Sequence, residues 1–547
     1  MDFYRTHILT IVAFLPLAGA IALMFFNKES KGGIRLWANL VGLAGFLVSV
    51  PLFFWFDYDS SGEMQFAESV PWIDALGVQY SVGIDGISLL LVLLTTLLGS
   101  IAILSSWESI QDRSKEFYIF MLMLQTGMLG VFISLDFFMF YVFWEVMLVP
   151  MYFLIGVWGG PRKLYAAIKF FLYTLVGSVL LLLGILSLYF QYPAIAAAVP
   201  EIANEFGSGY TFNILAFQAM AQYLSFDIQY WVFLVFFVGF AIKVPMFPFH
   251  TWLPDAHVQA PTAGSVILAG VLLKMGTYGF VRFSLPILPE AAVHFVPHMI
   301  TLAIIAIIYG ALVAMMQKDM KSLVAYSSVS HMGFIMLGMF ALNPNGLNGS
   351  ILQQINHGIS TGALFLIVGI IYDRRHTREI SEFGGLSTIM PVYATVFLIM
   401  TMSSIGLPVL NGFIGEFMIL QGALQENLWW AVAGASGIVL GAAYMLWLYQ
   451  RMMFGKLDNP ANEKLPDMNL RELVTLVPLI ILAFWIGIYP APFFKALDGP
   501  VNKIVETVRP GYFDANPLEV RNDAGAVPIA EILEPALEIG SGGGDNN

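Results

Sequence analysis

The stretch VGFAIKVPMFPFH, residues 238–250, places a lysine and two prolines inside a long apolar run. Proline removes a backbone donor and clashes with the preceding turn, so a helix breaks there. Within a bilayer such a break survives only where protein or water satisfies the freed backbone groups. A charged side chain at the bilayer centre costs roughly 2.5–3.5 kcal/mol on insertion scales. The stretch therefore indicates a membrane protein that uses buried charge to bind or move ions.

A second interrupted run, SSIGLPVLNGFIGE at 403–416, also ends beside an ionisable residue, Glu416. Two further charges, Glu145 and Lys274, lie inside apolar runs at 140–150 and 267–280. Each of the four charges falls well within a stretch that otherwise predicts a membrane span. Proline and glycine are common in membrane helices, but the ionisable neighbour at each break favours a functional role.

The composition excludes a large soluble enzyme. Of the 547 residues, 58% are hydrophobic and only 11% are charged, whereas soluble domains carry about 25% charged residues. The chain has no cysteine, so it has no thiolate for zinc or an iron–sulfur cluster. Much of the formal charge of −12 lies in connecting loops and the tail, and no basic patch predicts a nucleic-acid partner.

Spanning length predicts an all-α polytopic membrane protein with about fourteen transmembrane helices. The apolar run that follows Arg5 is longer than the core of a signal peptide, so it is assigned as a retained first span. The predicted spans are 8–26, 36–56, 86–106, 117–134, 137–157, 166–190, 229–252, 261–285, 298–316, 322–342, 350–372, 391–424, 429–450 and 471–494.

Lysine and arginine alternate between successive connections, which predicts orientation. The connections 57–84 and 191–228 contain neither residue. Two features break the pattern: the turn WLPDAHVQ (252–259) after the seventh span has no lysine or arginine, and Arg282 lies at a helix end on the other side. We therefore expect the basic loops in the cytoplasm and both termini outside, in a bacterial inner membrane. The basic connections are KESKGGIR (28–35), the pairs Arg113/Lys115 and Arg162/Lys163, QKDMK (317–321), DRRHTRE (373–379) and RMMFGK (451–456).

Paired breaks in spans 7 and 12 are typical of inverted repeats. Five spans separate them, an odd number, so the second copy is upside down. We expect spans 1–3 in residues 1–115, a first five-helix repeat in 116–285, a second inverted repeat in 297–455, and the last span with an acidic tail in 456–547. The tail is expected to be a surface segment from about residue 496, with a disordered end.

Proton transfer through a bilayer needs groups that hold and release a proton in a dry setting. Glu145 and Lys243 fit a switchable pair, since each stabilises the charge of the other when they approach. Lys274 fits a central relay and Glu416 a terminal acceptor. For Glu145 and Lys243, a static ion pair that fixes helix packing is the alternative.

Two histidines extend this set. His331, in AYSSVSHMGFIM, and His357, in QQINHGISTGALF, lie among Ser, Thr, Asn and Gln residues that order water or bond across helices. We expect both to relay protons, although a histidine in a span is also commonly a satisfied core residue.

We expect peripheral roles for the remaining titratable residues. His250, Asp255 and His257 lack a complete metal-ligand set, and His294 and His298 are assigned to the membrane interface. Lys318 and Lys321 are expected to be ordinary flanking charges, and Glu108 and Asp136 mark possible entrances near helix ends.

Four stretches carry a family resemblance. FWEVMLVPMYFLIGVWGG (143–160), the long run from Lys243 to Gly279, KSLVAYSSVSHMGF (321–334) and GLPVLNGFIGEF (406–417) resemble the antiporter-like subunits of respiratory complex I. The resemblance covers about spans 3 to 13. It is closest to the M-type subunits, equivalent to chain 4 of the mitochondrial enzyme, which carry glutamate at the break in span 12. The sister L and N types, and related multisubunit cation/proton antiporters, typically carry lysine there.

The resemblance implies a fourteen-helix fold with two inverted five-helix repeats. It further implies that Glu145, Lys243, Lys274 and Glu416 form a hydrated axis linked by His331 and His357. The expected function is proton translocation coupled to quinone reduction in NADH:quinone oxidoreductase. NADH, FMN, iron–sulfur clusters and quinone are then expected in partner subunits, with no cofactor or metal in this chain and with the L and N subunits as neighbours.

Other functions remain open at this point. One is a subunit of a multisubunit sodium/proton antiporter, which Glu416 disfavours. Another is a subunit of a related membrane hydrogenase or of a ferredoxin-fed quinone reductase, in which only the electron input differs. A third is a purely structural spacer in the same complex.

Overall fold

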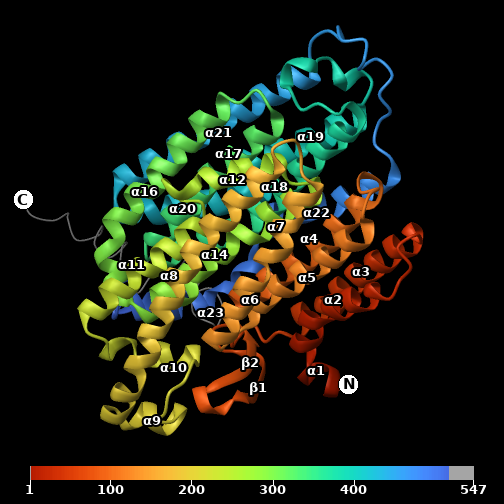
Figure 1. Ribbon diagram of the computed structural model, residues 1–547. Coiled ribbons are helices and arrows are strands. Elements are labelled where there is room, and N and C mark those ends of the chain that lie inside the picture. The colour runs from red at the N-terminus through yellow and green to blue at the C-terminus, as the bar shows by residue number, and fades with distance from the viewer. Residues whose placement is uncertain (1, 517–547) are drawn as a thin grey trace, which may run out of the picture.

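A computed structural model describes residues 2–516 of the chain as long helices that run side by side (Figure 1). Within these residues, twelve helices are long and apolar enough to cross a membrane. Two shorter apolar helices, α2 (Ile8–Met24) and α19 (Pro391–Ser404), accompany them. An all-α polytopic membrane fold is thereby confirmed, while the count of fourteen spans and the inverted repeats stay predictions.

Most of the long helices are continuous, and two consist of consecutive pieces. The spanning helices are α3 (Lys31–Trp55), α4 (Gly86–Ser109), α5 (Ser114–Ile133), α6 with α7 (Phe137–Val146 and Leu148–Trp158), α8 (Lys163–Ala198), α11 (Phe226–Lys243), the pieces from α13 to α15 (Thr262–Ile287), α16 (Pro289–Met315), α17 (Met320–Phe340), α18 (Pro344–Arg375), α21 (Leu428–Met453) and α22 (Leu470–Ile488).

Both predicted helix breaks are present. Helix α11 ends at Lys243, and the chain resumes as a 3₁₀ turn (η3, Phe249–Thr251) and α12 (Trp252–Gln259). Helix α19 ends at Ser404, and α20 (Asn411–Glu426) follows after an irregular segment. Pro245, Pro248 and Pro408 supply no backbone donor in these segments, which is why neither helix continues through them.

Two interruptions were not predicted. Helices α6 and α7 meet at Met147, three residues before Pro150, whose ring excludes a straight helix there. In the predicted eighth span, π-helical turns η4 (Leu268–Leu272) and η5 (Phe280–Ser284) enclose α14 (Leu273–Gly279), between α13 (Thr262–Ile267) and α15 (Leu285–Ile287). Such π turns are rare and shift backbone partners by one residue.

At one end of the helices lies a two-stranded hairpin, β1 (Gln65–Ile73) and β2 (Val78–Ile84). No secondary structure was predicted for this connection from the sequence. Its 3₁₀ turn η1 (Asp74–Leu76) closes with Gly77 at φ 67°. The hairpin shares this end with α1 (Asp2–Thr6), α9 (Pro200–Phe206), α10 (Ile214–Ala219) and η2 (Ala221–Tyr223), and we call it the hairpin end (Figure 1).

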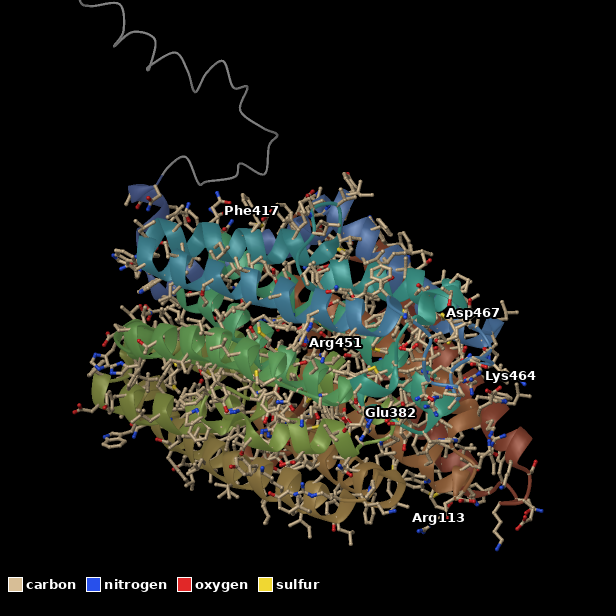
Figure 2. All side chains as sticks on the ribbon, turned by 90° about the horizontal axis from the view of Figure 1, so that it is seen from above. Arg113, Glu382, Phe417, Arg451, Lys464 and Asp467 are labelled. Atoms are coloured by element: carbon tan, nitrogen blue, oxygen red, sulfur yellow. The ribbon has the colours of Figure 1, made fainter. Side chains whose placement is uncertain are left out.

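The basic connections meet at the opposite end, which we call the loop end. Lys31 Nζ donates to the Gln111 carbonyl at 2.8 Å, and Lys115 Nζ donates to the Met24 carbonyl at 2.7 Å. Two 3₁₀ turns, η6 (Ile380–Glu382) and η7 (Leu386–Thr388), also lie in these connections. Figure 2, viewed from above, shows Arg113, Glu382, Lys464 and Asp467 toward the same side of the molecule.

After α22 the chain forms an ordered amphipathic helix, α23 (Ala491–Val508), followed by α24 (Tyr512–Ala515). This differs from the expected plain surface tail, because Phe493, Leu497, Val501 and Val505 repeat at helical spacing and are buried. They pack α23 at the hairpin end against α4 and α18. The predicted disordered end falls in 517–547, outside the described residues.

The centre of the molecule consists of α17, α18 and the α13–α15 segment. Their most apolar windows are 94%, 94% and 100% buried, respectively, whereas those of α3, α21 and α22 are each 33% buried. Three of the six predicted site residues, Lys274, His331 and His357, lie on these inner helices, so this part of the site is in the protein core.

Candidate functional site

Lys243 lies at the end of α11, against the turn that joins α6 to α7. Its side chain is 1% exposed. Its Nζ lies 4.8 Å from the centre of the Trp144 ring and 3.8 Å from Met147 Sδ. These contacts hold the ammonium by a cation–π interaction and a weak acceptor, and they bring Lys243 to Trp144, next to Glu145, and to Met147, two residues beyond it.

Glu145 and Lys243 therefore occupy one region without forming a direct ion pair. Within residues 2–516 no carboxylate oxygen lies within 4.0 Å of Lys243 Nζ. The Glu145 Oε1 atom is buried and has no hydrogen-bond partner, and the Tyr141 phenol lies beside this carboxylate. A buried carboxylate oxygen without a protein partner costs free energy, so this carboxylate is stabilised by a proton or by a nearby cation.

Lys274 is fully buried in α14 and faces His357 on α18. Its Nζ lies 2.6 Å from His357 Nδ1 and also donates to the Ala269 carbonyl. Ala269 belongs to the π turn η4. A π turn displaces backbone partners by one residue, which leaves this carbonyl available to the lysine. His357 Nε2 is buried without a partner.

His331 and Glu416 continue this arrangement across α17 and α20. The rings of His331 and His357 have centroids 5.6 Å apart. His331 Nδ1 lies 3.3 Å from Glu416 Oε1, and the same oxygen accepts from Gln353 Nε2 at 3.1 Å. We name Lys274, His357, His331 and Glu416 the central cluster. Its members come from four helices and are each at most 7% exposed.

The break between α19 and α20 makes room for the Glu416 carboxylate. Gly406 in this break has φ 73°, which L side chains rarely adopt, and a Cβ there would lie 2.7 Å from Glu416 Oε2. Ser404, the last residue of α19, has its Oγ 3.4 Å from His331 Nε2. Phe417, next to Glu416, is 54% exposed and projects from the outer edge of the helices (Figure 2). Helix α20 thus presents Glu416 to the core.

The structure divides the six predicted residues into two groups. No hydrogen bond or ion pair among residues 2–516 joins Lys243 to Lys274. Between their helices, a Cβ at Gly276 would meet the Phe240 carbonyl at 2.9 Å and Val244 Cγ2 at 2.7 Å. Close apolar packing therefore separates the Glu145–Lys243 region from the central cluster.

Several buried polar residues were not predicted to belong to the core. Lys321, expected to be a flanking charge, is 5% exposed and donates to the Ala260 carbonyl at 2.5 Å. His257 is fully buried with both ring nitrogens unpartnered, and it stacks on Phe365 at 4.6 Å. Because Lys321 follows a connection, its sequence context resembles that of any flanking lysine.

Arg282, which broke the charge alternation, forms a buried ion pair. Its Nη2 donates to Asp85 Oδ1 at 2.5 Å, and its Nε donates to the Tyr278 hydroxyl at 3.2 Å. Asp85 caps the first turn of α4 by accepting from the Ser88 amide. Arg282 stands alone among the even-numbered connections, which otherwise lack lysine and arginine, and this was the sequence signal for the pair.

The two predicted entrance residues, Glu108 and Asp136, differ in their exposure. Glu108 is paired with Arg471 at 2.8 Å, and its side chain is 63% exposed. Asp136 is 1% exposed and caps α6 by accepting from the Phe138 and Met139 amides. It also accepts from the Gln79 amide of β2 at 3.0 Å. Burial raises the pKa of Asp136 to about 6. Asp136 therefore joins the hairpin to α6.

Metal ligation has no support within the described part of the chain, where no group of three or more His, Cys, Asp or Glu side chains gathers. His294 and His298 are exposed near the start of α16. The central cluster consists of one amine, two imidazoles and one carboxylate, and all four are groups that can gain or lose a proton.

Known proteins share this fold and sequence. The family model described as NADH:quinone oxidoreductase/Mrp antiporter, TM, matches residues 134–442, more than half of the chain. NADH-quinone oxidoreductase subunit M of Rhodobacter capsulatus is 46% identical over 91% of this chain and 96% of its own. NADH-ubiquinone oxidoreductase chain 4 of Marchantia polymorpha is 43% identical over 90% and 96%, respectively.

Solved structures of other proteins share the fold of this chain. A chain of respiratory complex I from Thermus thermophilus superposes with a TM-score of 0.81 at 29% identity, over 91% of this chain and 99% of that one. A chain of the Mrp complex from Dietzia sp. DQ12-45-1b has a TM-score of 0.78 over 92% and 98%, but at 20% identity it shares the fold alone. The chain belongs to the NADH:quinone oxidoreductase/Mrp antiporter transmembrane family, among the proteins called subunit M or chain 4.

Proposed function

We propose that this chain is the proton-translocating M subunit of an NADH:quinone oxidoreductase, and that the central cluster carries the proton. The names of relatives at 41–46% identity support the first part. The observation that carries the second is the 2.6 Å contact between Lys274 Nζ and His357 Nδ1. At this separation a proton moves between two nitrogens without any displacement of the helices.

The proposed transfer runs from α14 toward α20. The Lys274 ammonium gives its proton to His357 Nδ1, which leaves a neutral amine and an imidazolium. His357 then releases a proton from its unpartnered Nε2, and a water molecule carries it across the ring separation to His331. His331 Nδ1, 3.3 Å from Glu416 Oε1, delivers a proton to the carboxylate. Each step moves one proton and one positive charge.

The Glu145–Lys243 region acts as the switch in this proposal. When Glu145 approaches Lys243, opposite charge stabilises the ammonium. When Glu145 withdraws, the ammonium rests on Trp144 alone and loses its proton more readily. Because close packing separates Lys243 from Lys274, the two groups influence each other through the electrostatic field. A field effect of this kind is strong in a medium of low dielectric constant.

Electron transfer belongs to other subunits in this proposal. The chain lacks cysteine ligands for iron–sulfur clusters and has no nucleotide-binding motif, so NADH, FMN and quinone bind elsewhere. The sister L and N subunits are the proposed neighbours in a bacterial inner membrane, with the basic loop end in the cytoplasm and the termini outside. The two five-helix repeats within 116–285 and 297–455 give the proposed halves of the path.

The test compares Lys274→Met with Lys318→Met in membrane vesicles that contain the assembled complex. Lys318 is an exposed lysine at the loop end and serves as the matched control. We expect Lys274→Met to lower the number of protons pumped per electron, while Lys318→Met pumps as the wild type does. An unchanged ratio in assembled Lys274→Met would contradict the role. Sodium-dependent pH changes without an electron donor would instead indicate an antiporter.

A further inference from the structure

A cavity lined by apolar and aromatic side chains lies between the N-terminal helix α3 and the C-terminal helix α22. Its volume is about 210 Å³, or about 790 Å³ when the open mouth is included. Its lining includes Val50 and Phe53 of α3, Trp485 of α22 and Ile359 of α18. None of its lining residues belongs to the central cluster, so this cavity is separate from the proton site.

The cavity follows α4 from the hairpin end to the middle of the membrane. Leu90, Leu94 and Leu97 line it at successive helical turns of α4, which begins at Gly86. Leu90 to Leu97 span about 10 Å along the helix axis, and Leu97 lies about 16 Å from Gly86 at the start of α4. The latter distance is about half of the ~30 Å hydrocarbon thickness, which is the depth of one leaflet and the length that one acyl chain fills.

The apolar lining of the cavity argues against ordered water, and its volume argues against a helix of a partner subunit. Ordered water needs two to four polar partners, and the lining offers almost none. A helix of a partner subunit is too large: a cylinder 10 Å wide and 10 Å long fills roughly 800 Å³, about four times the 210 Å³ of the cavity without its open mouth. The bilayer supplies acyl chains at this depth. We propose that the cavity binds an acyl chain of a phospholipid from the leaflet at the hairpin end.

The rim of the cavity matches a lipid interface. Phe53 contacts the Tyr58 ring at 5.9 Å and the Trp485 ring at 6.1 Å, and Tyr and Trp are enriched where head groups meet hydrocarbon. Lys495 Nζ lies 6.0 Å from the Tyr58 ring, and its side chain is 60% exposed beside Asp59. Lys495 Nζ also pairs with Asp59 Oδ1 at 2.8 Å, so a lipid phosphate at this rim would share the lysine with that carboxylate.

The lipid chain would pack behind the helix that carries His357. Ile355 and Ile359 of α18 both line the cavity, and each is two positions from His357. On an α-helix, residues two positions apart point to opposite sides. The acyl chain therefore fills the space behind α18 while His357 faces Lys274. The lipid site itself does not depend on the proposed proton transfer.

The first experiment measures lipid retained by the purified native complex during repeated detergent washing, using native mass spectrometry. Val50→Trp fills the cavity from α3, and Leu47→Trp adds the same bulk to α3 where Leu47 is 57% exposed and does not line the cavity. We expect the wild type and Leu47→Trp to retain one more phospholipid per chain than Val50→Trp. Equal retention in all three would overturn the proposal.

The second experiment avoids substitution. The wild-type complex is exchanged into phospholipid with brominated acyl chains, and its cryo-EM map is compared with that of the complex in unbrominated lipid. We expect excess bromine density between α3 and α22. A map in which this cavity lacks bromine, or holds a protein segment or a quinone tail, would overturn the assignment.

Discussion

Lys274 Nζ lies 2.6 Å from His357 Nδ1, although 83 residues separate them in the chain. Two cations do not share a contact this short, so at most one of the two groups carries the extra proton. Both are fully buried, and the remaining His357 nitrogen has no partner. In the proposed transfer, a proton that reaches Nδ1 from Lys274 is matched by the release of another proton from Nε2.

The first prediction concerns His357. His357→Phe keeps the ring volume and removes both nitrogens, so Lys274 loses its proton acceptor. We expect coupled proton pumping to fall by about tenfold or more, since loss of a positioned acid or base typically costs about 10²-fold or more. The measurement is proton uptake driven by NADH oxidation in vesicles. His298→Phe, an exposed histidine on α16, is the control, and equal pumping by both variants would contradict the relay.

The second prediction separates shape from proton exchange at Glu416. Glu416→Gln keeps the size of the side chain and an oxygen that can accept from Gln353 Nε2, but it neither gains nor loses a proton at neutral pH. We expect assembly to be normal and proton pumping to fall sharply. Glu416→Asp retains the carboxylate and should retain part of the pumping. Full pumping by Glu416→Gln would rule out a terminal acceptor at this position.

The third prediction concerns the break before α20. Gly406→Ala places a side chain at φ 73° and a Cβ 2.7 Å from Glu416 Oε2. A left-handed backbone costs a non-glycine residue about 1–2 kcal/mol, and the carboxylate has to move. We expect a lower thermal midpoint of the complex together with reduced pumping. Gly32→Ala, where a Cβ meets nothing within 4 Å, should change neither property.

The fourth prediction concerns the buried pair of Arg282 and Asp85. Removing one partner leaves an uncompensated buried charge, so Arg282→Met or Asp85→Leu alone should destabilise the fold by about 3–5 kcal/mol. The double variant Arg282→Met/Asp85→Leu should recover most of that loss. Thermal denaturation of the assembled complex measures both effects. Glu63→Gln, which breaks an exposed pair with Lys503, should cost less than about 1 kcal/mol.

The fifth prediction is a pH dependence from Asp136. Its pKa in the folded chain is raised to about 6 by burial, above the ordinary value of 3.8. The folded state therefore holds the proton more tightly than the unfolded state, and stability falls as the pH rises from about 4 to 6. The loss amounts to about 3 kcal/mol at most. Asp136→Asn should flatten the thermal midpoint between pH 4.5 and 7.

The control for that pH series is Glu201→Gln, since Glu201 is exposed in α9. This variant should keep the wild-type pH dependence. Asparagine also caps helices well, so Asp136→Asn removes the titration without removing the cap of α6. A pH profile that Asp136→Asn leaves unchanged would assign the dependence to another group.

The charged candidate residues could be identified from the sequence because of their apolar surroundings. Glu145, Lys243, Lys274 and Glu416 are isolated charges in long apolar runs, where desolvation is costly. His331 and His357 were visible through their polar neighbours. Lys321 and His257 were missed because each lies close to a helix end, where solvation is ordinarily available. Only packing against neighbouring helices removes that solvation.

Two details of the backbone could not be predicted from the sequence. The π turns around α14 occur in a run of ordinary helix formers, and the hairpin in 65–84 lies within a connection that has no strong turn signal before Gly77. Both depend on contacts with distant segments. The Ala269 carbonyl, for example, accepts from Lys274 because the turn there widens inside a fully buried helix.

The sequence by itself determined the membrane class, the positions of the two helix breaks and the residue types able to carry a proton. These follow from local composition, since proline interrupts a helix and charge is costly in lipid wherever the helix lies. Only the tertiary structure decided which of those residues meet. Contact across helices depends on packing between segments that are far apart in the chain. This packing brings Lys274, His357, His331 and Glu416 together, and it places Lys243 beside Trp144.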